Sequence, residues 1–339
     1  MKKDKILVIG ACGQLGTELT AALRKQYGFE NVIAADKKPA TADCISLDVL
    51  DTEKLRELVN TCAVTQVYLL AAMLSARGEQ YTAAAWNLNI KSLISVLDIA
   101  KEEKLDKVFW PSSIAVFGPG SPKHHCPQDA IMVPGTVYGI GKLAGENWCK
   151  YYFDKFGVDV RSIRYPGLIS YTAIPGGGTT DYAIEIFHHA LEGKSYTCFL
   201  NEDTCLPMMY MNDAVRATLA LMNAPKESVK IRTSYNISGT SFAPCDIAAA
   251  IRKHIPEFKI SYEPDFREAI AKAWPASISD CCALRDWGWK PRYKLPDLTG
   301  EMLQKLAELK GIPFKLKAGD DDFYPDFPMD NYVFTKHYE

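Results

Sequence analysis

The chain has 339 residues, of which 47% are hydrophobic and 24% charged, and its formal net charge is −2. This composition is ordinary for a soluble globular protein, and without a run of basic residues it gives little support to a nucleic-acid or membrane-surface role. No stretch approaches the ~18 uninterrupted apolar residues of a membrane span. An apolar run follows the first five residues directly, so we expect no leader peptide and a cytoplasmic protein, or a mitochondrial one if a transit peptide has been removed.

Short apolar or β-branched runs alternate with helical patterns through the first half of the chain. Such nearly continuous hydrophobic runs are typical of parallel strands covered by helices on both faces. The expected strands are 5–10, 31–36, 44–49, 66–72, 107–113 and 160–167. The alternation predicts an α/β fold with a Rossmann-like, doubly wound parallel sheet.

The alternation loosens in the second half, where a smaller C-terminal α/β region is expected. We predict a dinucleotide-binding domain over 1–170, with strands returning to it from about 206–239 (206–211 and 234–239), and a mainly substrate-binding region over 171–310. Residues 311–339 are interpreted as an extension that is packed on the surface or partly disordered.

A glycine-rich turn follows the first expected strand and opens the first expected helix. Gly10, Gly13 and Gly16 allow a tight turn, close approach of a pyrophosphate and helix–strand packing, and the helix start offers N–H groups to phosphates. Asp36 ends the second strand, where a carboxylate accepts ribose hydroxyls and repels a 2′-phosphate, which favours NAD over NADP. The neighbouring Lys37 weakens that preference slightly.

Further cofactor contacts are expected around this turn and at the ends of later strands. For the strand-end residues the alternative is simple strand packing. The candidates are Cys12, Gln14 and Leu15 in the turn, Asp48 and Val49 after the third strand, and Leu70, Ala71 and Ala72 after the fourth.

The spacing Tyr-x-x-x-Lys occurs three times, at Tyr138/Lys142, Tyr151/Lys155 and Tyr332/Lys336. Only the first pair follows the fifth strand, which ends at Ser112 and Ser113, and ligands of open α/β sheets bind off the carboxyl ends of strands. At positions i and i+4, Tyr138 and Lys142 lie on one side of a helix. We therefore predict that Tyr138 is the base that takes a hydroxyl proton.

A free phenol has a pKa of about 10, which is too high for a good base at neutral pH. The Lys142 ammonium and the positive charge of an oxidised nicotinamide are expected to lower the pKa of Tyr138. The same ammonium can bind the cofactor ribose, and Ser113 is expected to orient the substrate oxygen.

These segments resemble the extended short-chain dehydrogenase/reductases, a group that includes nucleotide-sugar epimerases and dehydratases. The resemblance lies in the glycine turn, the strand end PSSIAVFG, the Tyr/Lys pair and the segment RDWGWKP. It implies a supporting role for Asn89, which falls where the group keeps an asparagine for the active-site helix and a relay water. It also implies a dimer formed through the helices next to the sheet.

Four later segments, RYPGLIS (164–170), PGGGTTDYAIEIFHHAL (175–191), CFLNEDTCLPMMYMNDAVRA (198–217) and AWPASISD (273–280), are similar to those of short-chain-type L-threonine 3-dehydrogenases. This resemblance implies that NAD oxidises the threonine side-chain hydroxyl, giving 2-amino-3-ketobutyrate, without a metal. It places Tyr165, Pro166 and Leu168 beside the nicotinamide, and Ser75, Thr179, Asp181 and Trp274 around the amino acid. Hydroxyls of Ser75 and Thr179 would bind the carboxylate and Asp181 the ammonium, although Asp181 also fits a helix start and Trp274 an ordinary core position.

Two alternatives share the fold and the cofactor. A nucleotide-sugar epimerase would keep its NAD without net turnover, but the asparagine that usually follows Arg164-Tyr165 in that group is missing here. A non-catalytic NAD(P)-sensing protein would not need Ser113, Tyr138 and Lys142. His124-His125-Cys126 has no partner pair at zinc spacing, and the ten cysteines stand singly apart from Cys281-Cys282, as expected for reduced thiols.

Overall fold

The computed structural model of the protein describes residues 4–172 and 176–316. Its central element is a parallel sheet with the strand order β10-β6-β5-β4-β1-β2-β3. The strands are β1 (Ile6–Ile9), β2 (Val32–Asp36), β3 (Cys44–Ser46), β4 (Gln66–Leu69), β5 (Lys107–Ser113), β6 (Val160–Tyr165) and β10 (Tyr235–Asn236). The predicted doubly wound α/β fold is therefore confirmed.

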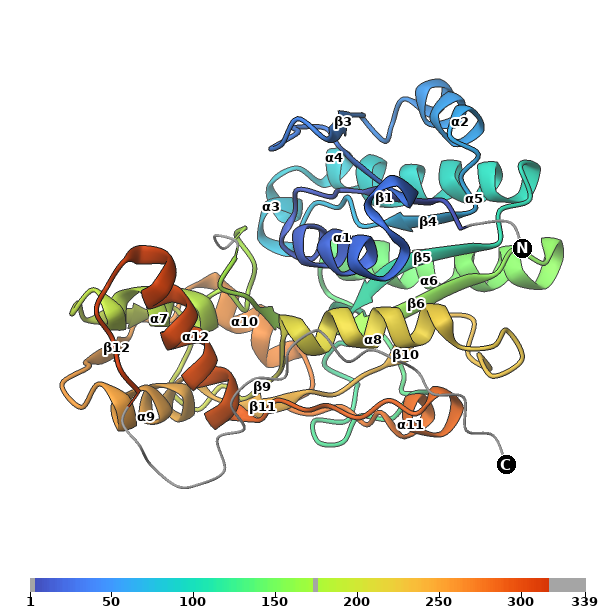
Figure 1. The fold of residues 1–339 in the computed structure, drawn as a ribbon. Coiled ribbons are helices and arrows are strands. Elements are labelled where there is room, and N and C mark those ends of the chain that lie inside the picture. Colours follow the sequence, from blue (N-terminus) through green and yellow to red (C-terminus); the bar gives the residue numbers. More distant parts are fainter. Residues whose placement is uncertain (1–3, 173–175, 317–339) are drawn as a thin grey trace, which may run out of the picture.

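Alternate side chains of the central strands enter two different cores, because successive residues of a strand point to opposite faces. Ile6 and Val8 pack with α1 and α8, whereas Leu7 and Ile9 pack with the helices of the other face. Figure 1 shows these two helical layers on either side of the sheet. The helices are α1 (Gln14–Tyr27) and α8 (Met211–Asn223) on one face, and α2 (Thr52–Thr61), α5 (Ser92–Glu102) and α6 (Val137–Phe156) on the other.

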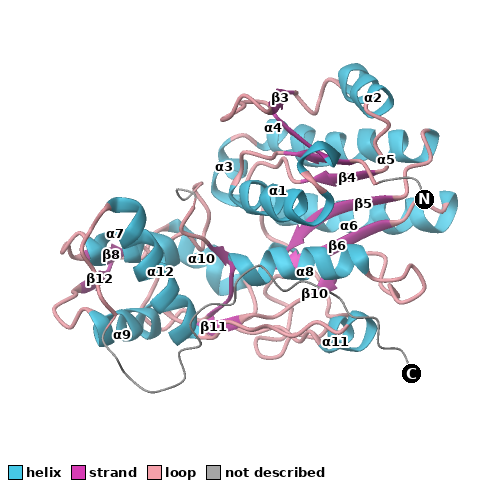
Figure 2. Cartoon of the chain, in the orientation of Figure 1, coloured by secondary structure: helices cyan, strands magenta, loops and turns pink. Residues whose placement is uncertain are grey.

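A second, smaller group of helices and short sheets extends from the carboxyl end of the central sheet (Figure 2). Its core contains Tyr182, Phe187, Met208 and Trp274. Its helices are α7 (Tyr182–Leu191), α9 (Pro244–His254), α10 (Phe266–Ala273) and α12 (Leu295–Lys310). Its strands are β7 (Gly167–Ile169), β9 (Leu206–Tyr210) and β11 (Thr240–Phe242) in one sheet, and β8 (Tyr196–Cys198) and β12 (Ile260–Tyr262) in another.

The remaining elements are short connections at the edges of these two regions. They are η1 (Phe29–Asn31), α3 (Ser75–Gln80), α4 (Thr82–Trp86), η2 (Asn87–Lys91), η3 (Ile114–Val116) and α11 (Cys281–Trp287).

Two of the expected strands differ from the structure, one in the residue where it ends and one in the sheet that it joins. The third ends at Ser46, since the chain then turns at Asp48, whose carbonyl accepts the N–H of Asp51 at 2.9 Å, and Asp51 caps α2. Of the two later strands, only β10 joins the central sheet, by pairing with β6; β9 instead pairs with β7 and β11. The interpretation of 311–339 as an extension falls mostly on residues outside the described part.

No helix in the described ranges is both long enough and apolar enough to cross a bilayer.

Candidate active site

The carboxyl ends of β1, β4, β5 and β6 meet at a cavity of about 270 Å³, whose lining also includes Thr179, Asp181 and Trp274 of the smaller region. This is the edge of the sheet where a doubly wound fold binds ligands. The cavity is lined by Gly10, Gly13, Gln14, Leu15, Gly16, Leu70, Ala72, Leu74, Ser75, Pro111, Ser112, Ser113, Ile114, Tyr138, Lys142, Tyr165, Pro166, Gly167, Leu168, Gly178, Thr179, Thr180, Asp181 and Trp274.

The glycine-rich loop has the geometry that a dinucleotide needs. Gly10 has a φ of +87°, and a Cβ on it would lie 2.6 Å from the backbone nitrogen of Ala71. A Cβ on Gly16 would lie 2.1 Å from the Gly10 carbonyl oxygen, so side chains are excluded at both positions. Helix α1 starts at Gly13 with no side-chain cap and no acidic residue in its first turn. Its first N–H groups therefore face the cavity as an anion site, and the loop fits a pyrophosphate.

The expected adenosine contacts lie beside the loop rather than in the cavity lining. The Asp36 carboxylate accepts the N–H of Cys12 at 3.1 Å and the N–H of Lys38 at 3.0 Å. Lys37 donates to Asp48 at 2.7 Å, and this interaction lowers the pKa of Asp48. Val49 is buried in the core on the α2 side of the sheet, so its side chain packs as a strand-end residue.

Residues after β4 and β6 line the cavity largely as the sequence suggested. Leu70 and Ala72 face it, whereas the backbone of Ala71 lies against Gly10. The Tyr165 ring also faces it, but its hydroxyl is hydrogen-bonded to Thr218 and burial raises its pKa. Tyr165 therefore lines the cavity with its ring, and its hydroxyl is not placed to transfer a proton.

Helix α6 places Tyr138 and Lys142 in the cavity. It begins at Thr136, whose hydroxyl accepts the N–H of Gly139 at 3.0 Å and so fixes the first turn. A Cβ on Gly139 would lie 2.1 Å from the carbonyl oxygen of Ala115, which shows how closely this turn approaches the chain after β5. That contact brings Tyr138 to the end of the strand that carries Ser113.

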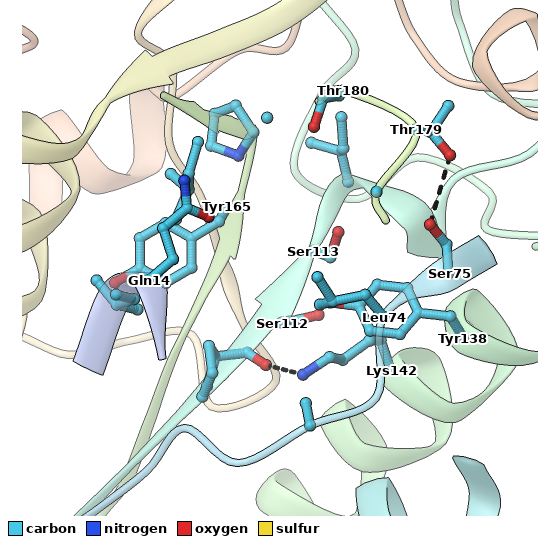
Figure 3. A pocket seen from close by; sticks show the side chains of 18 of the residues that line it. Gln14, Leu74, Ser75, Ser112, Ser113, Tyr138, Lys142, Tyr165, Thr179 and Thr180 are labelled. Carbon is cyan, nitrogen blue, oxygen red and sulfur yellow. Dashed lines mark hydrogen bonds between the residues drawn. The ribbon is translucent and has the colours of Figure 1, made fainter. Parts of the chain in front are cut away.

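The side chains of Ser113, Tyr138 and Lys142 lie together at the cavity (Figure 3). Tyr138 has a hydrogen bond with Ser113. The Lys142 ammonium nitrogen donates to the Pro111 carbonyl at 2.5 Å and lies 5.4 Å from the centroid of the Tyr138 ring. In the second Tyr/Lys pair, Tyr151 is exposed on the outer face of α6, and the third pair lies outside the described residues.

The pKa of Tyr138 differs from the expectation. Burial raises it to about 12, and the hydrogen bond with Ser113 opposes this only partly. Burial also lowers the pKa of Lys142 to about 7, against the influence of Cys149 and Glu146, which raise it. Both shifts have one cause, because removal from water disfavours whichever form carries the charge. Without a cofactor, the phenol therefore stays protonated near neutral pH.

A buried ion pair underlies this group. The Glu146 carboxylate, one turn after Lys142, accepts from Arg164 of β6 at 2.9 and 2.8 Å and from the Ser112 hydroxyl at 2.6 Å. Both charged side chains are 1% exposed. In the chain, Ser112 lies between Pro111, whose carbonyl accepts the hydrogen bond of Lys142, and Ser113, which interacts with Tyr138. The sequence reasoning missed this support, because a glutamate on a helix ordinarily lies in solvent.

The expected substrate residues gather at the far side of the cavity. The Ser75 and Thr179 hydroxyls face each other at 3.4 Å (Figure 3), and Trp274 closes the wall. The Asp181 carboxylate accepts the N–H groups of Gly177 and Gly178 at 2.8 and 2.7 Å, and burial raises its pKa. This carboxylate therefore stabilises the loop at Gly177 and Gly178, and it also lines the cavity.

Asn89 acts on a neighbouring loop. Its amide oxygen accepts the N–H of Met73 at 2.8 Å, and its amide nitrogen donates to the Met73 carbonyl at 3.0 Å. These bonds fix the chain that leads to Ser75. A role in proton relay stays a prediction.

Several lining residues were not singled out from the sequence. Most adjoin a predicted residue, which is the signal that could have found them. They are Leu74, Pro111, Ser112, Ile114, Gly167, Gly178 and Thr180.

The fold and the site define an enzyme that works with a nicotinamide dinucleotide. Comparison with known proteins agrees with this class. The chain belongs to the NAD dependent epimerase/dehydratase family, whose model matches residues 6–238. Within the described residues no cluster of histidine, cysteine and carboxylate side chains is suited to a metal ion.

Three similar proteins carry one activity in their names. The chain is 55% identical to a partial consensus L-threonine 3-dehydrogenase, with a TM-score of 0.89 over 90% of this chain and 99% of the other. It is 54% identical to the holo form of a GalE-like L-threonine dehydrogenase from Cupriavidus necator, with a TM-score of 0.88 over 89% and 99%. It is also 45% identical to mitochondrial L-threonine 3-dehydrogenase of Sus scrofa, over 89% of this chain and 82% of the relative.

Burial of Lys142 predicts a pH-dependent stability difference between the protein and Lys142→Met. Since the pKa of Lys142 falls from 10.5 to about 7 on folding, the unfolded chain binds the extra proton between these values. The lysine therefore destabilises the fold increasingly as the pH falls from 10.5 to 7. The free energy of unfolding of Lys142→Met, relative to that of the unsubstituted protein, should therefore increase by about 2 kcal/mol or more when the pH is lowered from 9.5 to 6.5. Urea unfolding at the two pH values measures this difference.

Lys155→Met is the matched control, because Lys155 is exposed on the same helix. Its stability relative to the unsubstituted protein should not change over this pH range. A Lys142→Met difference that stays constant with pH would show that the amine is not desolvated.

Proposed function

We propose that the protein is an NAD-dependent L-threonine 3-dehydrogenase, which oxidises the threonine side-chain hydroxyl to give 2-amino-3-ketobutyrate. The observation that carries this proposal is the cavity itself, where Ser113, Tyr138 and Lys142 stand opposite the hydroxyl pair of Ser75 and Thr179. Three relatives named for this activity, each covering most of the chain, support it.

The chain's own residues handle the proton of the alcohol. Ser113 orients the threonine hydroxyl, and Tyr138 accepts its proton. A bound oxidised nicotinamide would supply the hydride acceptor for the carbon that bears this hydroxyl, and a positive charge. The Lys142 ammonium, fixed by the Pro111 carbonyl, stabilises the phenolate.

The remaining cavity walls suit a small zwitterion. Hydroxyls of Ser75 and Thr179 donate to the substrate carboxylate, and Asp181 attracts the ammonium through the oxygen lone pairs that Gly177 and Gly178 leave free. Trp274 limits the size of the amino acid.

We also propose a preference for NAD over NADP. The Asp36 carboxylate is oriented by two backbone N–H groups at the end of β2, ready to accept ribose hydroxyls. Lys37, which could attract a 2′-phosphate, is paired with Asp48.

All ten cysteines are free, which fits a reducing compartment, either cytoplasm or mitochondrial matrix.

The assignment of the base is tested with Tyr138→Phe. This substitution should lower threonine-dependent NADH formation by about 100-fold or more, since it removes the proton acceptor, while the Kd for NAD changes little. NADH absorbance measures the first and a fluorescence titration the second.

Tyr151→Phe, from the exposed Tyr/Lys pair on the same helix, should behave as the unsubstituted protein. Equal losses in the two variants would reject Tyr138 as the base. Conversion of a UDP-sugar without NADH formation would instead indicate an epimerase. If a folded protein that binds NAD gave no turnover with either substrate, it would be a sensor.

The cofactor preference is tested with Asp36→Ser. Loss of the carboxylate should raise KM for NAD and lower KM for NADP, which shifts the ratio of kcat/KM values toward NADP by about tenfold or more, or about 1.4 kcal/mol. Asp43→Ser is the control, because this nearby exposed carboxylate pairs with Arg24. An unchanged ratio in Asp36→Ser would contradict the proposal.

We further propose that the chain forms a homodimer through the outer face of α6 and α4. Trp148, Tyr151 and Trp86 are exposed there, and the Trp148 and Tyr151 rings pack edge to face 5.7 Å apart. Exposed aromatic side chains gathered on one face are typical of protein interfaces.

Light scattering should therefore give the mass of two chains for the protein. Trp148→Glu combined with Tyr151→Glu should give one chain, because two buried charges would face each other across the interface. Leu309→Glu changes an exposed leucine of α12 and should leave the dimer intact. A monomer before any substitution would exclude this interface.

A further inference from the structure

Two cysteine thiols meet beside the dinucleotide loop. Cys12 lies within that loop, Cys44 begins β3, and their sulfur atoms are 3.6 Å apart. A disulfide has a sulfur–sulfur distance of about 2.05 Å, so the bond would need a closure of about 1.5 Å. The two positions belong to separate segments, 32 residues apart in the chain.

The Cys12 sulfur is the more accessible of the two. Cys12 is half-buried, whereas Cys44 is 8% exposed. The N–H of Ala40, in the exposed turn between β2 and β3, donates to the Cys12 sulfur at 3.3 Å. Because Cys12 is only half-buried, a small oxidant can reach its sulfur, which is in contact with that of Cys44.

We propose that Cys12 and Cys44 form an oxidative modification site, at which a hydroperoxide joins the two thiols in a disulfide that weakens dinucleotide binding. This rests on the proposed function only in that the cofactor is a dinucleotide held by the glycine loop. Nothing in it depends on which alcohol is oxidised.

The chemistry proceeds in two steps. The Cys12 thiolate attacks one oxygen of hydrogen peroxide, the O–O bond breaks, and the products are a sulfenic acid and, after proton uptake, water. The Cys44 sulfur then attacks the Cys12 sulfur, the S–O bond breaks, and the departing hydroxide leaves as a second water with the Cys44 proton. Two thiols are oxidised and one peroxide is reduced.

The environment of Cys44 suits the second, slower step. Burial raises the pKa of its thiol to about 12, and the hydrogen bond with Cys12 and the charges of Asp36 and Asp43 act in the same direction. Cys44 therefore stays protonated until a sulfenic acid forms beside it. The thiolate is the attacking form of a cysteine, so the disulfide should form more slowly than the sulfenic acid.

The bond changes the part of the loop that binds phosphate. Cys12 lies between Gly10 and Gly13, which both line the cavity, and its N–H donates to Asp36. Drawing Cys12 toward β3 moves the loop N–H groups away from their phosphate positions and disturbs the Asp36 carboxylate. By linkage, a bound dinucleotide must oppose disulfide formation to the same extent.

The test exposes the full-length protein to hydrogen peroxide, with and without NAD, and then blocks the remaining thiols. Trypsin cuts after Arg24 and after Lys37, so a disulfide joins two separate peptides that mass spectrometry detects. We expect the linked 12–44 peptide and a rise in the Kd for NAD of about fivefold or more. Dithiothreitol should reverse both changes, and saturating NAD should slow the linkage.

Cys44→Ser should show neither the linked peptide nor a dithiothreitol-reversible loss of NAD affinity. Cys281→Ser, which removes one thiol of the adjacent pair at the start of α11, should respond as the unsubstituted protein. Absence of the linked peptide, a linked protein with unchanged NAD affinity, or an equal reversible loss in Cys44→Ser would each overturn the proposal. These readouts do not use threonine, so they are independent of the test of the dehydrogenase activity.

Discussion

The active site depends on the ion pair between Glu146 and Arg164, which lies beneath it. A buried carboxylate and guanidinium persist only when nearly every polar atom has a partner, and here Ser112, Gln128 and Asn236 supply the remaining bonds. The pair joins α6 to the adjacent strands β5 and β6. Since Tyr138 and Lys142 come from α6 and Ser113 from β5, it fixes the helix and the strand whose relative position defines the site.

A second buried ion pair, at the start of β6, connects this strand to the end of α8. Asp159, just before β6, accepts from Arg161 at 2.8 Å and also pairs with Arg232, and Arg161 donates to three carbonyls at the end of α8. This cluster lies at the start of β6, whereas the Arg164 pair lies at its carboxyl end. One strand thus holds the end of α8 at its start and the helix that carries Tyr138 and Lys142 at its carboxyl end.

The sequence identified what local patterns determine. Periodicity located the strands up to β6, and the place of each Tyr/Lys pair along the chain predicted that Tyr138 and Lys142 lie at the ligand edge of the sheet, where the structure has them, because the carboxyl ends of parallel strands share one edge. It could not assign β9 to its sheet, since a short apolar run indicates a buried strand but not its partner. Nor could it indicate that Glu146 is buried or that Asp181 bonds its own loop, because both depend on tertiary packing.

Burial also explains why the site needs its cofactor before it can act. The same removal from water keeps Tyr138 protonated near neutral pH and makes Lys142 lose its proton more readily. A bound oxidised nicotinamide would add a positive charge that lowers the pKa of Tyr138, and in a low dielectric this effect is larger than it would be in water. Under the proposed function, proton transfer to Tyr138 therefore depends on dinucleotide binding at the loop between β1 and α1.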